Sequence, residues 1–240
     1  MLNLALILAS GGLIAVIVIV VLLVVVVFAF IGMYNKLVQL RNRVKEAWAQ
    51  IDVQLKRRYD LLPNLVETVK GYASHENETL TKVIEARNQA MQALKEVNNM
   101  VQQSGGIPVG SGGGAPGGSM PSPMGGGGGG GAEGGGMGAL INAEGLLMGA
   151  MKNMQITVEQ YPDLKANQNF MQLQEELVST ENRIAFARQH YNDEVRQYNT
   201  KREVIPSNIV ASMGGFQPAA YFEIRSEERE AVQVDFGASS

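Results

Sequence analysis

The chain has 240 residues, of which 45% are hydrophobic, and it carries a net charge of −3 and no cysteine. The absence of cysteine excludes disulfides, thiolate metal sites and anchoring through a lipidated cysteine. Basic residues are not interleaved with aromatic ones, so nucleic acid is not an expected partner. About 200 residues remain outside the apolar N-terminal segment, enough for one domain with a modest core.

The first 35 residues contain no Asp, Glu, Lys, Arg or His, and they include the valine-rich segment Leu13–Ile31. A bilayer core of about 30 Å is crossed by roughly 20 apolar residues in a helix. We therefore predict a short N-terminal tail and a transmembrane helix within 1–33. A cleaved signal peptide is the alternative, but it would have a basic start and a small-residue cleavage site. This segment instead ends in the bulky sequence Phe28-Ala29-Phe30.

Basic residues follow the apolar segment before the first acid, Glu46, and they are Lys36, Arg41, Arg43 and Lys45. Positively charged flanks stay on the cytoplasmic side of a membrane. We expect the N-terminus outside and the rest of the chain in the cytoplasm. Because these residues immediately follow the predicted span, we also expect them to contact anionic lipid head groups.

Residues 34–103 are predicted to form a first helical hairpin. Its first helix, Tyr34 to about Tyr72, carries apolar residues at steps of three and four, which is the period of an amphipathic helix: Leu37, Leu40, Val44, Ala47, Ile51, Leu55, Leu62, Leu65 and Val69. Pro63 is expected to kink or restart this helix, with Asp60 as the cap of the restart. The second helix carries Leu80, Val83, Ile84, Met91, Leu94 and Val97.

Residues 104–138 are rich in Gly, Pro and Ser and include the run Gly125–Gly131. Such a segment cannot bury enough apolar surface to offset its chain entropy, so we predict a flexible linker. Phosphate-binding glycine loops are short and have a lysine nearby. This stretch has neither Lys nor Arg, which argues against a nucleotide site.

Residues 139–205 are predicted to hold the remaining helices. Ala139–Tyr161 is one, and a second follows a heptad pattern that is typical of helix-on-helix packing: Phe170, Leu173, Leu177, Thr180, Ile184, Ala187, Tyr191, Val195 and Tyr198. Pro206 ends it. Residues 206–240 are expected to be an irregular tail, with a short extended segment at Val232, Val234 and Phe236 as one possibility for its end.

Two dipeptides repeat at seven residues in the last helix, Tyr191-Asn192 and Tyr198-Asn199. They are bundle or interface candidates. Buried asparagines would fix the register of a partner, whereas the alternative is an ordinary core with tyrosine hydroxyls reaching solvent. Trp48, the only tryptophan, is a core candidate, with an exposed interface role as the alternative.

Charged residues offer weaker candidates. Lys56-Arg57-Arg58 is expected on a solvated face or paired with acids of the second half such as Glu175-Glu176, since residues 33–101 carry +3 and residues 102–240 carry −6. His75, Glu76 and Glu78 are expected at a solvated helix end, because the other histidine, His190, is remote in sequence. No metal, cofactor or catalytic residue set is expected, so we do not expect an enzyme.

Three segments resemble the LemA family: YNKLVQLRNRVKEAWAQIDVQLKRRYDLLPNLVETVKGYASHENETL (34–80), YPDLKANQNFMQLQEELVSTENRIAFARQHYNDEVRQYN (161–199) and PSNIVASMGGFQPAAYFEI (206–224). LemA-like proteins are bacterial membrane proteins with one N-terminal span, and the family includes a magnetosome-formation protein. The resemblance implies an all-α fold in which a transmembrane helix continues into an antiparallel bundle of long helices. The glycine tract departs from the usual short connection.

We therefore expect a single-pass protein of the bacterial inner membrane that acts as a structural or assembly protein. Its expected partners are membrane lipids and further copies of itself, and the glycine tract would be either a spacer or a segment ordered only by neighbouring copies. The alternative is a monomeric or dimeric adaptor that recruits another membrane protein, a protease or a signalling component.

Overall fold

The computed structural model describes residues 2–73, 75–109 and 135–223, and their side chains from Ile17 onward. These residues form six helices: α1 (Leu2–Lys70), α2 (Asn77–Gln103), α3 (Gly135–Val158), α4 (Pro162–Lys165), α5 (Gln168–Glu203) and α6 (Ser207–Met213). Within the described ranges the only β-type pairing is an isolated bridge between Val109 and Ala219. The predicted all-α fold, with an apolar N-terminal helix that runs into a bundle, is confirmed.

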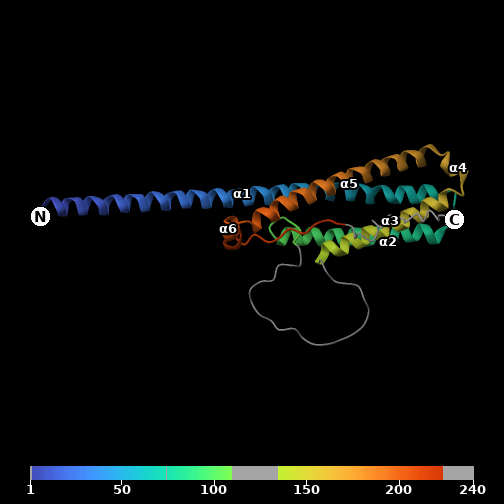
Figure 1. The fold of residues 1–240 in the computed structure, drawn as a ribbon. Helices are drawn as coiled ribbons and strands as arrows, with labels where there is room; N and C mark the ends of the chain where they lie inside the picture. The colour runs from blue at the N-terminus through green and yellow to red at the C-terminus, as the bar shows by residue number, and fades with distance from the viewer. Residues whose placement is uncertain (1, 74, 110–134, 224–240) are drawn as a thin grey trace, which may run out of the picture.

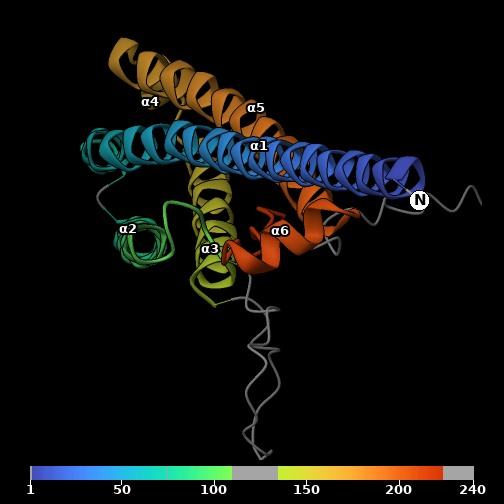
Figure 2. The same ribbon diagram turned by 90° about the vertical axis from the view of Figure 1, so that its left-hand side faces the viewer.

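Helix α1 is the spine of the molecule (Figure 1). Helix α5 packs along one side of α1, and α2 pairs with α3 on the other side and also contacts α1. The short helix α6 lies at the end of the bundle from which the N-terminal part of α1 projects (Figure 1). The view in Figure 2 shows α5 and the α2–α3 pair on different sides of α1.

The apolar pattern of the sequence defines the core on α1 and α5. All nine apolar positions predicted on the inner face of α1 are buried. On α5, eight of the nine heptad positions are buried and Leu173 is half-buried. Burying one such large aliphatic or aromatic side chain contributes about 1.5–3 kcal/mol, so these two stripes supply much of the stability. Asn167 caps the start of α5, because its Oδ1 accepts a hydrogen bond from the Phe170 N–H at 3.1 Å.

The expected restart of the first helix at Pro63, with Asp60 as its cap, is wrong. Helix α1 continues without interruption through Pro63. A proline has no N–H to donate, so the carbonyl of Tyr59, four residues earlier, loses its usual helical partner. Arg87 of α2 replaces that donor, with its Nε 2.6 Å from the Tyr59 carbonyl oxygen. The neighbouring helix thus satisfies the group that proline leaves unpaired.

The predicted linker 104–138 begins where α2 ends, at Gln103, but its last residues belong to α3. Ile107 is buried, and α3 begins at Gly135, four residues before the helix expected from Ala139. The run Gly125–Gly131 lies outside the described residues, so its role stays a prediction.

The described part of the tail, residues 207–223, holds α6 and a turn that follows it. Helix α6 ends in a paired turn, in which the Phe216 N–H donates to the Ala211 carbonyl and the Gly215 N–H to the Ser212 carbonyl. Gly215 has a φ of +66°, the left-handed conformation that this helix ending requires. The chain reverses there and returns along the bundle. The predicted extended segment at Val232, Val234 and Phe236 lies outside the described residues.

Candidate functional site

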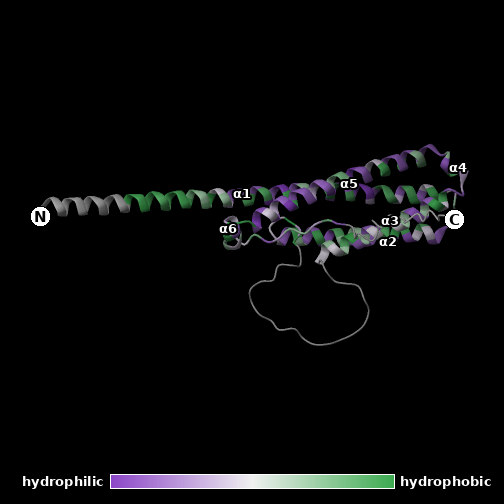
Figure 3. Ribbon diagram, in the orientation of Figure 1, coloured by the Kyte–Doolittle hydropathy of each residue, from purple (hydrophilic) through white to green (hydrophobic). Residues whose placement is uncertain are grey.

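The N-terminal part of α1 projects alone from the bundle and is strongly apolar (Figure 3). Every residue from Ile17 to Ala29 is exposed, and Phe30 is the first described residue to pack partly on the core. By length and composition, α1 is the one helix in the described part of the chain that could cross a membrane. Because α1 is continuous from Leu2 to Lys70, the apolar segment and the bundle share one helix without a flexible joint.

The four basic residues after this segment have different surroundings. Lys36 and Arg43 are exposed. Arg41 is half-buried and places its guanidinium carbon 5.3 Å from the ring centre of Phe216, a cation–π contact. Lys45 is exposed, but its stem lies against Gly106, where an added Cβ would come within 2.9 Å of the Lys45 Cδ. Contact of Lys36, Arg41, Arg43 and Lys45 with lipid head groups stays a prediction.

The two Tyr-Asn pairs of α5 bind the returning C-terminal segment. Asn192 and Asn199 each form two hydrogen bonds with one residue of that segment: Nδ2 donates to the carbonyl and Oδ1 accepts from the N–H of Phe222 and Ala219, respectively, at 2.9–3.1 Å. The hydroxyls of Tyr191 and Tyr198 donate to the carbonyls of Ala220 and Gln217 at 2.7 and 2.8 Å.

Both tyrosines are fully buried, so the expectation that their hydroxyls reach solvent is wrong. The hydroxyls find partners in the C-terminal segment instead, which a pattern within α5 alone cannot reveal. Burial also raises the pKa of each of these tyrosines. The four residues fix the register of a segment of their own chain. A role for them between copies stays a prediction.

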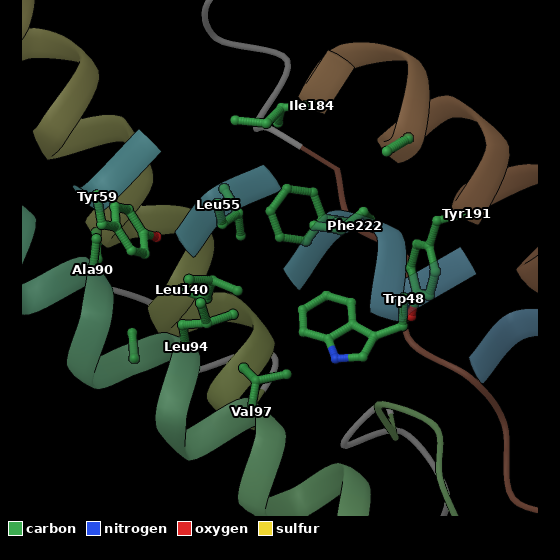
Figure 4. Packing of buried hydrophobic residues seen from close by; sticks show 14 of the residues in the cluster. Trp48, Leu55, Tyr59, Ala90, Leu94, Val97, Leu140, Ile184, Tyr191 and Phe222 are labelled. Atoms are coloured by element: carbon green, nitrogen blue, oxygen red, sulfur yellow. The ribbon is translucent and has the colours of Figure 1, made fainter. Parts of the chain in front are cut away.

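Trp48 lies where α1, α2, α5 and the C-terminal segment meet (Figure 4). Only 3% of it is exposed, and its ring packs edge-on against Tyr191 and tilted against Phe222, at centroid distances of 5.7 and 6.3 Å. Its indole Nε1 donates to Asn98 Oδ1 of α2 at 3.0 Å. Trp48 is therefore a core residue.

A buried ionic cluster joins α1, α3 and α5. Arg58 is 2% exposed and is paired with Glu144 of α3 and, at 2.7 Å, with Glu181 of α5. The hydroxyl of Tyr59 donates to the second oxygen of Glu144. Arg188 stands near the cluster, where burial lowers its pKa despite the attraction of Glu181.

Of the two expectations for Lys56-Arg57-Arg58, Arg58 is not on a solvated face but does pair with acids of the second half, Glu144 and Glu181. Arg57 does pair with Glu176, at 2.6 Å, and exposed Lys56 pairs with Asp52 at 2.7 Å. The missed signal is position: Arg58 falls on the apolar stripe between Leu55 and Leu62. A charge on such a stripe indicates a buried ion pair, because an unpaired buried charge is too costly.

Glu144 occupies the corresponding stripe of α3, between Leu140 and Leu147, and gives the same signal. The ion pairs of Arg57 and Arg58 with Glu144, Glu176 and Glu181 all join the basic half of the chain to the acidic half. At least part of the charge complementarity between the two halves is therefore satisfied by ion pairs within one chain.

The two histidines are apart and exposed. His75 is in the turn between α1 and α2, whereas His190 is on α5. Among the residues that the structure describes, no group of three or more His, Asp or Glu side chains is placed to share a metal ion.

An apolar groove runs along the outer side of the α1–α5 pair and was not predicted. Its volume is about 670 Å³, and its most exposed apolar members are Val53 (59%) and Phe186 (73%). Ala49, Gln50, Gln54, Arg183, Ala187 and His190 complete the lining. Both large side chains lie off the apolar stripes of their helices, which is the sequence signal for an outward-facing patch.

A smaller groove of about 330 Å³ lies between α1, α3 and α5, above Arg58. Its lining includes Met148, Met151, Met154, Leu65, Phe170 and Val178. Methionines are flexible and polarizable, so such a surface adapts to differently shaped apolar partners.

Comparison with known proteins identifies relatives over most of the chain. The LemA family profile matches residues 47–236. The magnetosome protein MamQ 2 of Paramagnetospirillum magneticum is 30% identical over 203 residues, which cover 82% of this chain and 68% of that protein. MamQ of Magnetospirillum gryphiswaldense is 25% identical over 79% of this chain and 64% of its own length. Protein LemA of Metamycoplasma hominis is 25% identical over 87% of this chain and 76% of its own length.

Proposed function

Since this chain belongs to the LemA family, we propose that it is a membrane-anchored structural protein whose copies associate through the outer face of their helical bundles. The observation that carries this proposal is the exposure of Phe186, 73% of which faces out of α5 beside the groove shared with α1. None of the relatives' names states a reaction, which supports a structural rather than a catalytic role.

The groove suits a contact between identical surfaces. Aromatic side chains are enriched at the centres of protein interfaces, and Phe186 supplies such an anchor. In a two-fold contact, each copy presents the same patch, so Phe186 of one copy meets the wall formed by Val53 and Ala187 of the other. Gln50, Gln54 and Arg183 give this patch the polar rim that interfaces usually have.

Anchoring of every copy in the same membrane favours this contact between bundles. The apolar part of α1 would confine every copy to one membrane, and the continuous helix holds each bundle at the same height above it. Confinement raises the effective concentration of the facing patches, so association needs less affinity than it would in solution. We propose that the family's soluble bundles meet laterally in this way.

The proposed location is the bacterial inner membrane, with the N-terminus outside and the bundle in the cytoplasm. The basic residues from Lys36 to Lys45 support this orientation, because positive flanks remain inside. The chain has no cysteine, so a single cysteine at Asn3 or at the exposed Gln160 can be labelled without background. An impermeant maleimide should label intact cells at Asn3 only. Labelling at Gln160 in intact cells would contradict the proposed orientation and place the bundle outside the cytoplasm.

The test of self-association is the mass of the detergent-extracted full-length protein by light scattering. The wild type should form a species larger than one copy, and Phe186→Asp should reduce its mass. Leu146→Asp is the matched control, because Leu146 is also an outward-facing apolar residue, on α3, with 60% exposure. A wild-type protein with only a single-copy mass would contradict the proposal.

Cross-linking in membranes provides a second readout. A cysteine at Gln50 lies in the same groove and should give disulfide-linked pairs, which Phe186→Asp should abolish. A cysteine at Asn153, on the far side of the α2–α3 pair, should not. Equal cross-linking at the two positions would indicate random collision rather than a defined interface.

The second candidate function is an adaptor that recruits another membrane protein. The methionine-lined groove between α1, α3 and α5 favours it, because that surface is apolar and adaptable. A single-copy mass, together with loss of a co-purified partner in Val178→Asp, would support the adaptor. Val178 is 62% exposed, so this substitution changes the groove and leaves the core intact.

A further inference from the structure

Helix α6 presents a second apolar surface, which the self-association proposal does not use. Ser207, Val210 and Ala211 are buried against the bundle, and the opposite side carries Ile205 (81% exposed), Ile209 (57%) and Met213 (74%). Ile209 and Met213 are four residues apart in α6 and share one side of it, and Ile205 is exposed in the turn that leads into α6. We call Ile205, Ile209 and Met213 the α6 apolar face.

The α6 apolar face is close to the end of the predicted span. The turn after α6 places Phe216 edge-on against Tyr34, with ring centres 5.4 Å apart, and under Arg41. At 1.5 Å per residue, Arg41 is about 15 Å along the helix from Ile31, where the apolar segment ends. Helix α6 also lies at the end of the bundle that faces the projecting part of α1 (Figure 1).

The charge pattern around α6 fits a lipid surface. No charged residue occurs from Val204 to Phe222, so no charge in this segment opposes transfer toward the acyl boundary. Basic residues lie before it and on α1, and the exposed acid Glu203 directly precedes Val204. Lys201 and Arg202 are in the last turn of α5, and exposed Lys36 and Arg43 are on α1. An apolar face with cations nearby fits an element that lies in the interface of an anionic membrane.

We propose that the α6 apolar face inserts into the lipid surface beside the span, as a second contact of the same chain with the same membrane. Interfacial elements place their apolar side about 5–10 Å into the boundary between head groups and acyl chains. The contact of Phe216 with Tyr34, three residues beyond Ile31, puts the turn after α6 beside the end of the apolar segment. The continuous α1 holds α6 at this height. The bundle would then contact the membrane through both α1 and α6, which would limit its tilt. The lateral faces of neighbouring copies would therefore stay aligned.

This inference depends on the anchoring part of the proposed function and not on self-association. The occupant is lipid rather than a protein because the face lies next to a segment that itself enters the bilayer and is bordered by cations. Another copy or another protein is an outcome that the experiment separates.

The experiment uses full-length single-cysteine variants at Ile205, Ile209 and Met213, each spin-labelled and reconstituted into vesicles of phosphatidylglycerol and phosphatidylcholine. Accessibility to oxygen, which concentrates in lipid, is compared with accessibility to a water-soluble nickel complex. Val178→Cys is the control for an exposed apolar position away from the membrane, and Val25→Cys is the control for the span. All five positions are exposed on the protein, so the labels do not disturb its core.

The expected result is an oxygen-dominated signal at Ile205, Ile209 and Met213, as at Val25, and a nickel-dominated signal at Val178. Nickel accessibility at all three positions equal to that at Val178 would overturn the inference, while lipid exposure at Val25 in the same vesicles would leave the anchor intact. A water-like signal at Val25 would instead refute the anchor itself.

Dilution separates lipid from protein as the occupant. At less than one copy per vesicle, labels on the α6 apolar face should remain inaccessible to the nickel complex, because lipid still covers the face. Shielding that disappears on dilution would assign the face to a second copy and overturn the lipid proposal. A companion variant, Met213→Glu, should raise the nickel accessibility of a label at Ile209, since it adds a charge to the inserted stripe.

Discussion

Asn192 and Phe222 are joined by two hydrogen bonds between one side-chain amide and the backbone N–H and carbonyl of one residue, at 2.9 and 3.1 Å. Asn199 repeats the arrangement on Ala219, two helical turns along α5. The amide pairs with this backbone as a neighbouring strand would, so α5 serves as a template for an extended segment without a β-sheet. The seven-residue spacing of Asn192 and Asn199 therefore sets the register of the C-terminal segment on α5.

Asn192→Ala should release the C-terminal segment. Each lost hydrogen bond contributes about 0.5–1.5 kcal/mol, and a buried group left unpaired costs about 1–3 kcal/mol, so we expect a loss of roughly 1–3 kcal/mol. Hydrogen exchange should accelerate from Gln217 to Phe222 and remain slow in α2. Gln197→Ala, at an exposed position of the same helix, is the control. Unchanged exchange at Phe222 would contradict this role.

Arg87 and Pro63 should be coupled, because Arg87 supplies the donor that Pro63 lacks. A charge-assisted hydrogen bond of this kind contributes about 1.5–3 kcal/mol. Arg87→Met should therefore destabilise the wild type by about that amount. It should cost clearly less in a Pro63→Ala background, where the backbone N–H of the introduced alanine can donate to the Tyr59 carbonyl. The four free energies of unfolding form a double-mutant cycle, and additive effects would argue against the coupling.

Glu144 and Glu181 should differ in their contribution although both bind Arg58. The side chain of Glu144 is 9% exposed and that of Glu181 40%. Glu144→Ala leaves Arg58 buried without its inner partner and should cost about 3–5 kcal/mol. Glu181→Ala should cost about 1 kcal/mol or less, because water replaces the lost contact. Urea unfolding followed by the signal of Trp48 measures both, and Glu144→Gln, which keeps an acceptor, should fall between them.

Alkaline pH should loosen the bundle through its buried tyrosines. Burial raises the pKa of Tyr59 to about 12, although Arg58 pulls it down. The folded state therefore holds this proton more tightly than the unfolded state, whose pKa is about 10. The resulting stability is fully present below pH 10 and is lost as the pH rises through 12, by roughly 2–3 kcal/mol. Tyr59→Phe should flatten this part of the stability curve, and Tyr221→Phe, at an exposed position, should not.

The helices themselves were predictable because their evidence is local. The stripe from Leu37 to Val69 and the heptads of α5 follow the helical period, and each is buried as the pattern indicates. The first helix, expected to run to about Tyr72, ends at Lys70. The prediction of a restart at Pro63 was wrong because the Tyr59 carbonyl that Pro63 leaves unpaired is bonded by Arg87. Arg87 is 24 residues from Pro63 in sequence and on another helix.

The candidate surfaces also fall into those that local sequence signals selected and those that only the fold revealed. The basic residues after the span, the Tyr-Asn repeats and Trp48 were selected from composition and spacing, and the fold brings Trp48, Tyr191 and Asn192 together around Phe222. The groove beside Phe186 and the α6 apolar face were missed. Exposed apolar residues have no period of their own, and their meaning depends on which neighbours leave them uncovered.

By itself, the sequence determined an uncharged apolar helix followed by cations and a set of amphipathic helices, because hydrophobic periodicity and charge act over a few turns of chain. Only the tertiary structure decided that α1 passes Pro63 unbroken, that Arg58 is buried between two acids, and that the C-terminal segment is held by α5. Each of these depends on a hydrogen bond or an ion pair between residues far apart in sequence. Such pairings become defined only when packing brings the two partners within about 3 Å.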